Sequence, residues 1–176
     1  MKKRAPIAYP LVGAELADFG PLGARTDYAI NGGSSTTGGG DRMKITLGLD
    51  GVWMLGRNVT VPNVADGLSH TYLVGEKSMD VAKYVTGQDV GDRAPIAGLV
   101  DNPGAANSYV RFAARAPSPD VAGNCLACHD FGSAHFSGWN MSMADGSVHS
   151  FSYSIDLVLH RALASIDGDE AETELD

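Results

Sequence analysis

The most constraining feature of the sequence is an alternating stretch between residues 138 and 155, which the dipeptide Asp145-Gly146 divides in two. Before the dipeptide, large apolar residues alternate with small or polar ones, and they are Trp139, Met141 and Met143. After it, larger residues alternate with serines, and they are His149, Phe151, Tyr153 and Ile155. A period of two places successive side chains on opposite faces of a strand, and Asp-Gly is a strong turn signal. The stretch therefore predicts a β-hairpin.

The side-chain pattern also selects the register of this hairpin. A two-residue loop would pair Met143 with Val148 and set the apolar face of one strand beside the serine face of the other. A three-residue loop over 144–146 pairs Met143 with Ser147 instead, and a slip of one residue exchanges the two faces of a strand. We predict the three-residue loop, with Gly146 in the left-handed conformation that such a loop needs. The further cross-strand pairs are then Met141 with His149 and Trp139 with Phe151.

The rest of the chain favours strands and turns over a helical bundle. Among 176 residues there are 22 Gly and 8 Pro, and the hydrophobic share of 44% is enough for a core. Alternation and apolar runs predict short strands near 45–49, 52–55, 59–61 and 71–74, with long loops at 86–108 and 115–130. We expect an α+β fold, mainly an antiparallel β-sheet with long loops and a short C-terminal helix.

That helix is predicted from apolar residues near the C-terminus that recur at helical spacing: Ile155, Leu159, Ala162, Leu163 and Ile166. The helix is expected to begin near Ser154 or Asp156, which are both favourable N-caps, and Gly168 suits its C-terminal end. We expect an amphipathic helix that packs on the sheet, with His160 exposed beside Arg161.

The chain divides into an irregular N-terminal arm (1–24), one β-rich domain (25–166) and an acidic tail (167–176).

The 13 Lys and Arg of the chain against 21 Asp and Glu give a net charge of −8, which disfavours binding to nucleic acid. The longest apolar run is well short of the ~20 residues that a membrane-spanning helix needs. The basic start, 1–4, resembles that of a signal peptide, but Pro and Gly interrupt the residues after it, so no export signal is predicted in the chain as given.

Four blocks of residues, in order, resemble the prepilin-type, processing-associated H-x9-DG family of bacteria. They cover roughly residues 25–165. The blocks are Asp27-Tyr28 with Asn31-Gly32-Gly33, then DGLSHTYLVGEK (66–77), then FGSAH (131–135) followed after nine residues by DGSV (145–148), and lastly SYSID (152–156) with HRAL (160–163).

The resemblance implies location and architecture more than activity. Members resemble pseudopilins, which usually begin with a prepilin signal and a long hydrophobic helix ahead of a periplasmic or surface β-domain. The chain as given lacks that helix, so we expect an export segment to be missing from it. The resemblance implies a non-enzymatic structural subunit, periplasmic or at the cell surface, in a homo-oligomer or larger assembly. Structural parts follow for His135 at the start of the hairpin and for Asp145 and Gly146 in its loop, because a catalytic His/Asp pair would lack a nucleophile or second base.

The two cysteines lie in a second motif, Cys125-Leu126-Ala127-Cys128-His129. In c-type cytochromes the two thiols of C-x-x-C-H bond the haem vinyl groups, and the histidine ligates the iron. Haem c on Cys125, Cys128 and His129 would make the chain an electron-transfer subunit. Its distal position would stay open or take a ligand from the hairpin region that comes next in the chain, where the candidates are Met141, Met143, His135 and His149.

Other cofactor hypotheses stay open. Cys125 and Cys128 would equally form a disulfide outside the cytoplasm, or remain a free dithiol. A zinc site with His135 as a third ligand is weaker, because one C-x-x-C with lone histidines is a poor zinc signature. Calcium is a further hypothesis, based on acidic residues in a Gly-rich loop without the D-x-D-x-D-G spacing: Asp89, Asp92 and Asp101.

Overall fold

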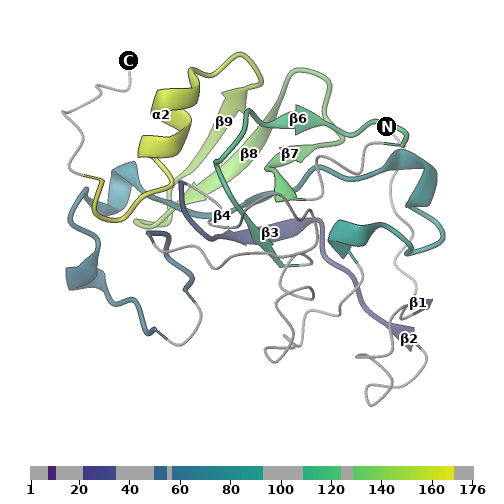
Figure 1. Cartoon of the computed structure of the whole chain (residues 1–176), viewed down its shortest axis with the longest axis horizontal. Coiled ribbons are helices and arrows are strands. Elements are labelled where there is room, and N and C mark those ends of the chain that lie inside the picture. The colour runs from purple at the N-terminus through teal and green to yellow at the C-terminus, as the bar shows by residue number, and fades with distance from the viewer. Residues whose placement is uncertain are drawn as a thin grey trace.

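The computed structural model describes residues 8–10, 22–34, 50–54, 57–92, 109–123 and 129–168 (Figure 1). The strands are β1 (Tyr9–Pro10), β2 (Leu22–Gly23), β3 (Tyr28–Asn31), β4 (Tyr72–Glu76), β5 (Val110–Arg111), β6 (Ser118–Pro119), β7 (Gly132–Ser133), β8 (Gly138–Met143) and β9 (Val148–Ser152). The helix α2 (Leu157–Ala162) comes after β9. Short 3-10 helices are η2 (Val61–Asn63), η3 (Leu68–His70), η4 (Val81–Lys83) and η5 (Val90–Asp92).

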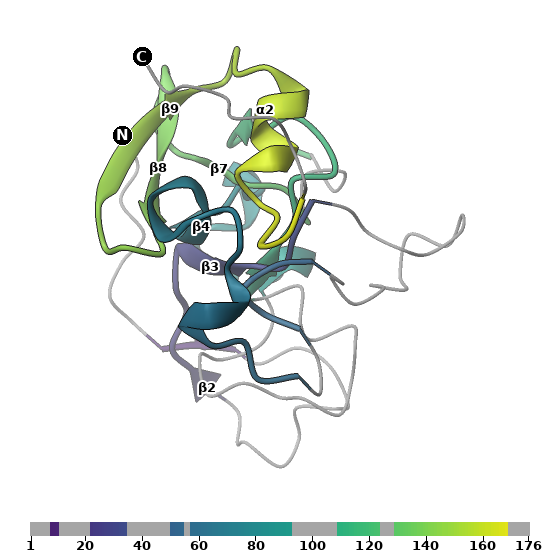
Figure 2. The same cartoon turned by 90° about the vertical axis from the view of Figure 1, so that its left-hand side faces the viewer.

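A five-stranded sheet of order β5-β3-β4-β8-β9 forms the centre of the molecule. β3, β4, β8 and β9 are antiparallel to one another along this order, whereas β5 lies parallel to β3. β1 pairs with β2 and β6 with β7 in two small sheets, and β1 and β2 lie at the opposite end of the molecule from α2 (Figure 2). The predicted α+β, β-rich fold is confirmed. The sheet is mixed because the long connection between β4 and β5 allows the chain to return in the direction of β3.

β8 and β9 form the predicted hairpin in the predicted register. Trp139 lies opposite Phe151, and Met141 lies opposite His149. The backbone N–H of Met143 donates to the carbonyl of Ser147 at 2.8 Å, which closes the three-residue loop. Gly146 has φ +89°, the left-handed conformation that glycine adopts without steric cost. The residues of β8 alternate between half-buried and buried, as the apolar pattern requires.

α2 packs its apolar side against the sheet, as predicted, and Asp156 caps it by accepting from Val158 and Leu159 N–H. The buried core that α2 covers comprises Tyr72, Ala113, Phe131, Trp139, Met141, Met143, Leu163 and Ala164. The expected exposure of His160 is wrong, because its side chain is fully buried. Its ring packs against those of Tyr72, Phe131 and Trp139, so His160 lies on the inner side of the helix.

The helix ends at Ala162, six residues before the glycine expected to stop it. Residues 163–166 continue as a non-helical strap that is buried throughout. Its backbone is bonded to the rest of the fold: Tyr72 N–H donates to the Leu163 carbonyl at 2.7 Å, and Ile166 N–H donates to the Asp50 carbonyl at 2.8 Å. Ile166 is therefore buried by these tertiary bonds and not by helical periodicity.

Several local expectations change. The strand predicted near 71–74 is confirmed as β4, but the one at 59–61 is wrong, because Pro62 and the cap by Thr60 form the 3-10 helix η2 instead. Of the strand predicted at 52–55, residues 52–54 are described, and there Met54 forms an isolated bridge with Arg57; residues 45–49 lie outside the described residues. Within the N-terminal arm predicted to be irregular, β1 and β2 form a short two-stranded sheet, and Tyr9 of β1 is buried against Gly87. No helix in the described ranges is long and apolar enough to span a membrane.

Candidate functional site

His135 and Glu76 join two of the sequence blocks at one end of the hairpin. His135 Nε2 lies 3.2 Å from Glu76 Oε1, and Glu76 Oε2 accepts the backbone N–H of Asn140 at 2.7 Å. The last regular pair between β4 and β8 is Gly75 with Met141. The Glu76 carboxylate thus takes over hydrogen bonding where the β4–β8 ladder ends, and the imidazole holds it in place.

The loop that carries His135 is fixed from both sides. Ser133 Oγ accepts from the His135 N–H at 2.9 Å and donates to the Gly138 carbonyl at 2.8 Å. The Tyr153 hydroxyl donates to the His135 carbonyl at 3.1 Å. A side chain at Gly138 would meet the Phe151 carbonyl at 2.0 Å, so only glycine allows this close approach of β8 to β9. These contacts fix the backbone position of His135.

Asp145 organises the hairpin loop through hydrogen bonds of its side chain. Its Oδ1 accepts from the Ser147 hydroxyl at 2.7 Å and from the Ser147 N–H at 2.8 Å, and these bonds hold the pKa of the Asp145 carboxyl below its usual range. Ser147 Oγ lies 3.1 Å from His149 Nε2. The loop also rests on η3, because Asp145 N–H donates to the Leu68 carbonyl at 3.0 Å.

Asn31, in the Asn-Gly-Gly block, connects three separate segments from a fully buried position. Its Nδ2 donates to the carbonyls of Tyr72 at 2.9 Å and Ala164 at 2.8 Å, and its Oδ1 accepts from Gly33 N–H at 2.9 Å. The next residue, Gly32, lies so close to the Phe112 ring that a Cβ would come within 2.5 Å of it. The block therefore joins β3 to β4 and to the strap after α2.

A buried ion pair connects the end of β4 to the 3-10 helix η5. Lys77 comes directly after β4, and its Nζ donates to Asp92 Oδ1 at 2.7 Å, with both side chains almost fully excluded from solvent. Arg111 is also buried and donates to the Gly91 carbonyl at 2.9 Å. Two cations thus meet the 3-10 helix η5, which fixes the segment 90–92 against β4 and β5.

The residues proposed for haem are only partly described. Cys125 and Cys128 lie outside the described residues, whereas His129 is half-buried and its carbonyl accepts from Phe112 N–H at 3.0 Å. Met141 is fully buried, and its Sδ would lie 2.8 Å from a Cβ at Gly75.

The other distal candidates differ in exposure and in contacts. Met143 is fully buried, like Met141, whereas His149 is exposed and contacts Ser147. His135 is bound to Glu76. The hairpin places Met141 opposite His149 as predicted, but Met141 is buried and His149 is exposed.

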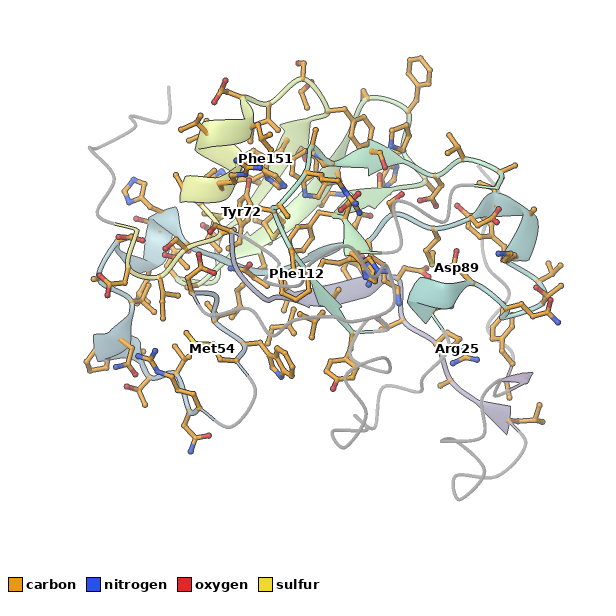
Figure 3. All side chains as sticks on the ribbon, in the orientation of Figure 1. Arg25, Met54, Tyr72, Asp89, Phe112 and Phe151 are labelled. Carbon is orange, nitrogen blue, oxygen red and sulfur yellow. The ribbon has the colours of Figure 1, made fainter. Side chains whose placement is uncertain are left out.

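The aspartates proposed for calcium bind protein donors in this structure. Asp89 accepts from Asp80 N–H at 2.6 Å and from Gly91 N–H at 2.7 Å, and Asp92 accepts from Lys77. Asp89 lies on the opposite side of the molecule from Tyr72 (Figure 3), and Asp101 is outside the described residues. Over the described ranges, no group of three or more His, Cys, Asp or Glu is arranged to hold a metal ion.

Glu76, Asn31 and Lys77 were not singled out from sequence, although each stands inside a block of the resemblance. A glutamate at the end of a strand or an asparagine before two glycines suits an exposed loop equally well. Their partners lie far along the chain, at distances that periodicity and local motifs do not report. The sequence offered one signal for these three residues, namely that each lies inside one of the resemblance blocks. That signal does not indicate which residues they contact.

Comparison with known proteins assigns the chain to a family. Residues 12–158 match a family described as "Protein of unknown function (DUF1559)". The match spans most of the chain, and the chain belongs to this family. No curated protein and no solved structure matches it.

Removal of the Glu76 carboxylate is expected to weaken the hairpin. Glu76→Ala leaves the half-buried Asn140 N–H without its acceptor, and we expect this to cost about 1–2 kcal/mol of unfolding free energy, less than for a fully buried donor. His135→Ala removes only a part-exposed contact with the Glu76 carboxylate and should cost less than about 1 kcal/mol. Urea denaturation of both variants measures the difference. Glu76→Gln keeps one acceptor oxygen and is the control, so an equal loss in Glu76→Gln and Glu76→Ala would contradict the role given to Asn140.

Proposed function

We propose that this chain is a non-enzymatic structural subunit of an extracytoplasmic, pseudopilin-like assembly. The contact between His135 and Glu76 carries the proposal, because it links the histidine of the H-x9-DG pattern to the YLVGEK block. Asp145 and Asn31 likewise bind the protein's own backbone. Residues that define a family and hold its fold together suit a scaffold more than a reaction centre.

The edge strand β9 supports an assembly role. β9 is the last strand in the order of the central sheet, and Val148, His149 and Ser150 are exposed. The strand carries no Lys, Glu or Pro, the residues with which sheet edges commonly avoid pairing with other chains. Such an edge is suited to contacts with another subunit.

Assembly is tested on the full chain, directed to the bacterial periplasm by an added cleavable signal. We expect light scattering after size exclusion, together with chemical cross-linking in cells, to reveal a homo-oligomer or larger complex. Val148→Lys, in β9, should reduce its size by adding an edge charge. Val158→Lys, in α2, is the matched control, since both valines are 69% exposed. A strictly monomeric wild-type protein, or one that functions in the cytoplasm, would overturn the proposal.

The alternative is a c-type haem-bearing electron-transfer subunit, favoured by the motif Cys125-x-x-Cys128-His129. The donor set suits haem c, which would supply one-electron redox chemistry when bound. His129 is held by its carbonyl bond to Phe112 N–H. A distal role for Met141 would require its thioether to leave the core, whereas His149 is already exposed.

The haem alternative predicts a covalent adduct. When expressed in a host that matures c-type cytochromes, the protein should gain the mass of one haem and give a pyridine haemochrome spectrum. Cys128→Ser should lose the normal two-thioether spectrum, whereas Ser150→Ala, an exposed change in β9 away from the motif, is the control and should keep it. An apoprotein mass would exclude haem, and a mass lower by two hydrogens would indicate the disulfide.

A further inference from the structure

His160 is a buried titratable residue that none of the roles above uses. It lies in α2 with its side chain fully excluded from solvent. Three aromatic rings surround it, with centroid distances of 5.6 Å to Tyr72, 6.2 Å to Phe131 and 5.5 Å to Trp139. Phe151 packs on Tyr72 at 5.4 Å, and the two are seen together beneath α2 (Figure 3). The imidazole is thus the polar centre of an aromatic cluster between helix and sheet.

The polar atoms of this histidine suit only its neutral form. Nδ1 lies 3.3 Å from the Tyr72 hydroxyl, whereas Nε2 has no hydrogen-bond partner in the described part of the chain. A protonated imidazole donates from both nitrogens and needs an acceptor for each. The Tyr72 oxygen can serve Nδ1, but a charged Nε2–H would remain buried without an acceptor, which is costly in an apolar site.

The attachment of α2 allows it to move separately from the strap 163–166. Beside the His160 cluster, α2 is held by the Arg161 guanidinium, which donates to the Ala114 carbonyl at 2.7 Å from an exposed position. The strap has its own bonds to Tyr72, Asn31 and Asp50, besides those that join it to the end of α2. A helix of six residues does not persist without packing, so α2 can unwind from the sheet while these other bonds keep the strap in place.

We propose that α2 is an acid-sensitive latch, in which protonation of His160 releases the helix from the sheet and exposes the aromatic cluster. The groups that face His160 are the Tyr72 hydroxyl from β4, the ring of Phe131 just before β7, the ring of Trp139 from β8, and Arg161 on its own helix. Phe131 and Trp139 do not titrate, and burial raises the pKa of Tyr72, which stays neutral in acid. His160 is thus the group of this cluster that changes charge in mild acid.

The pH range depends on the two states of the helix. Burial, with a smaller contribution from Arg161, lowers the pKa of His160 from 6.5 to about 4 while the latch is closed. Once released, the imidazole regains its ordinary pKa. Above pH 6.5 both states are neutral, and opening does not depend on pH. Between 6.5 and about 4 only the open state takes up the proton, so the opening constant rises tenfold per pH unit, about 300-fold in all.

Amide hydrogen exchange on the intact chain tests the latch. Corrected for intrinsic exchange, the protection of the His160 and Leu163 amides, which donate to Asp156 and Leu159, should fall about tenfold per unit below pH 6. The amides of Met143 and Ala144 in the hairpin should keep their protection. His160→Phe, which fills the ring site without titrating, should make α2 independent of pH.

The controls separate the latch from other causes. His149→Gln alters an exposed histidine and should behave as wild type, and His160→Gln replaces the Phe variant if that one does not fold. The proposal is overturned if wild-type α2 shows no loss of protection in acid or if His160→Phe retains that loss. It is equally overturned if hairpin and helix amides lose protection together, because the event would then be global unfolding.

Discussion

Asn31→Ala is expected to destabilise the protein by about 3–5 kcal/mol, because several buried backbone groups lose a partner worth about 1–3 kcal/mol each. The asparagine is fully buried and bonds the Tyr72 carbonyl, the Ala164 carbonyl and the Gly33 N–H. Alanine can replace none of these bonds. The three lost partners are backbone groups of packed segments, so a shift of a flexible side chain does not repair the loss.

Urea denaturation followed by circular dichroism measures this loss. Asn140→Ala is the control, because Asn140 is half-buried in the same sheet and its side-chain oxygen accepts from the exposed Ser150 hydroxyl. That variant should lose less than about 1 kcal/mol. Asn31→Asp should be as harmful as the alanine variant, since a carboxylate oxygen would face two carbonyls. A loss below about 1 kcal/mol in Asn31→Ala would contradict the bridging role.

Lys77→Met is expected to cost about 3–5 kcal/mol of unfolding free energy, because it removes the cation that contacts the Asp92 carboxylate in a buried site. The two side chains are 0% and 1% exposed, and their charged atoms are 2.7 Å apart. The methionine retains most of the apolar stem of lysine, so the loss arises from the broken charge pair and not from packing.

A double-variant cycle separates the cost of breaking the charge pair from the cost of changing each side chain alone. Lys77→Met with Asp92→Leu removes both charges and should recover most of the stability, because a buried pair often contributes little beyond an apolar replacement of similar volume. The i,i+3 pair of Lys83 with Asp80 provides a surface comparison, since that lysine is 36% exposed, and Lys83→Met should cost less than about 1 kcal/mol. Losses that simply add in the double variant would show that the ion pair is not the cause.

Both large predictions concern residues inside the sequence blocks on which the predicted family resemblance rests. Asn31 stands in the Asn-Gly-Gly block, and Lys77 ends the YLVGEK block. Their bonds run to β4, to the strap after α2 and to η5. The blocks are therefore physically connected in the fold.

The local sequence pattern predicted an element correctly where the interactions that determine the element join residues close together in the sequence. The hairpin, its register and the φ of Gly146 were predictable from alternation and one turn, since a wrong register would turn Trp139 and Met141 away from the core. The cap of α2 was predicted as Ser154 or Asp156, and the structure uses Asp156. The strand expected at 59–61 failed because a proline and a capping threonine outweighed two β-branched residues.

The sequence by itself determined the β-rich class, the hairpin with its three-residue loop and the start of the C-terminal helix, because each depends on residues within about one turn or one strand pair. Only the tertiary structure decided which polar residues are buried and what they bind. Asn31 reaches Ala164 across 133 positions, and the Tyr72 hydroxyl meets His160 across 88. Burial and pairing are set by packing between distant segments, and neither leaves a periodic trace in the chain.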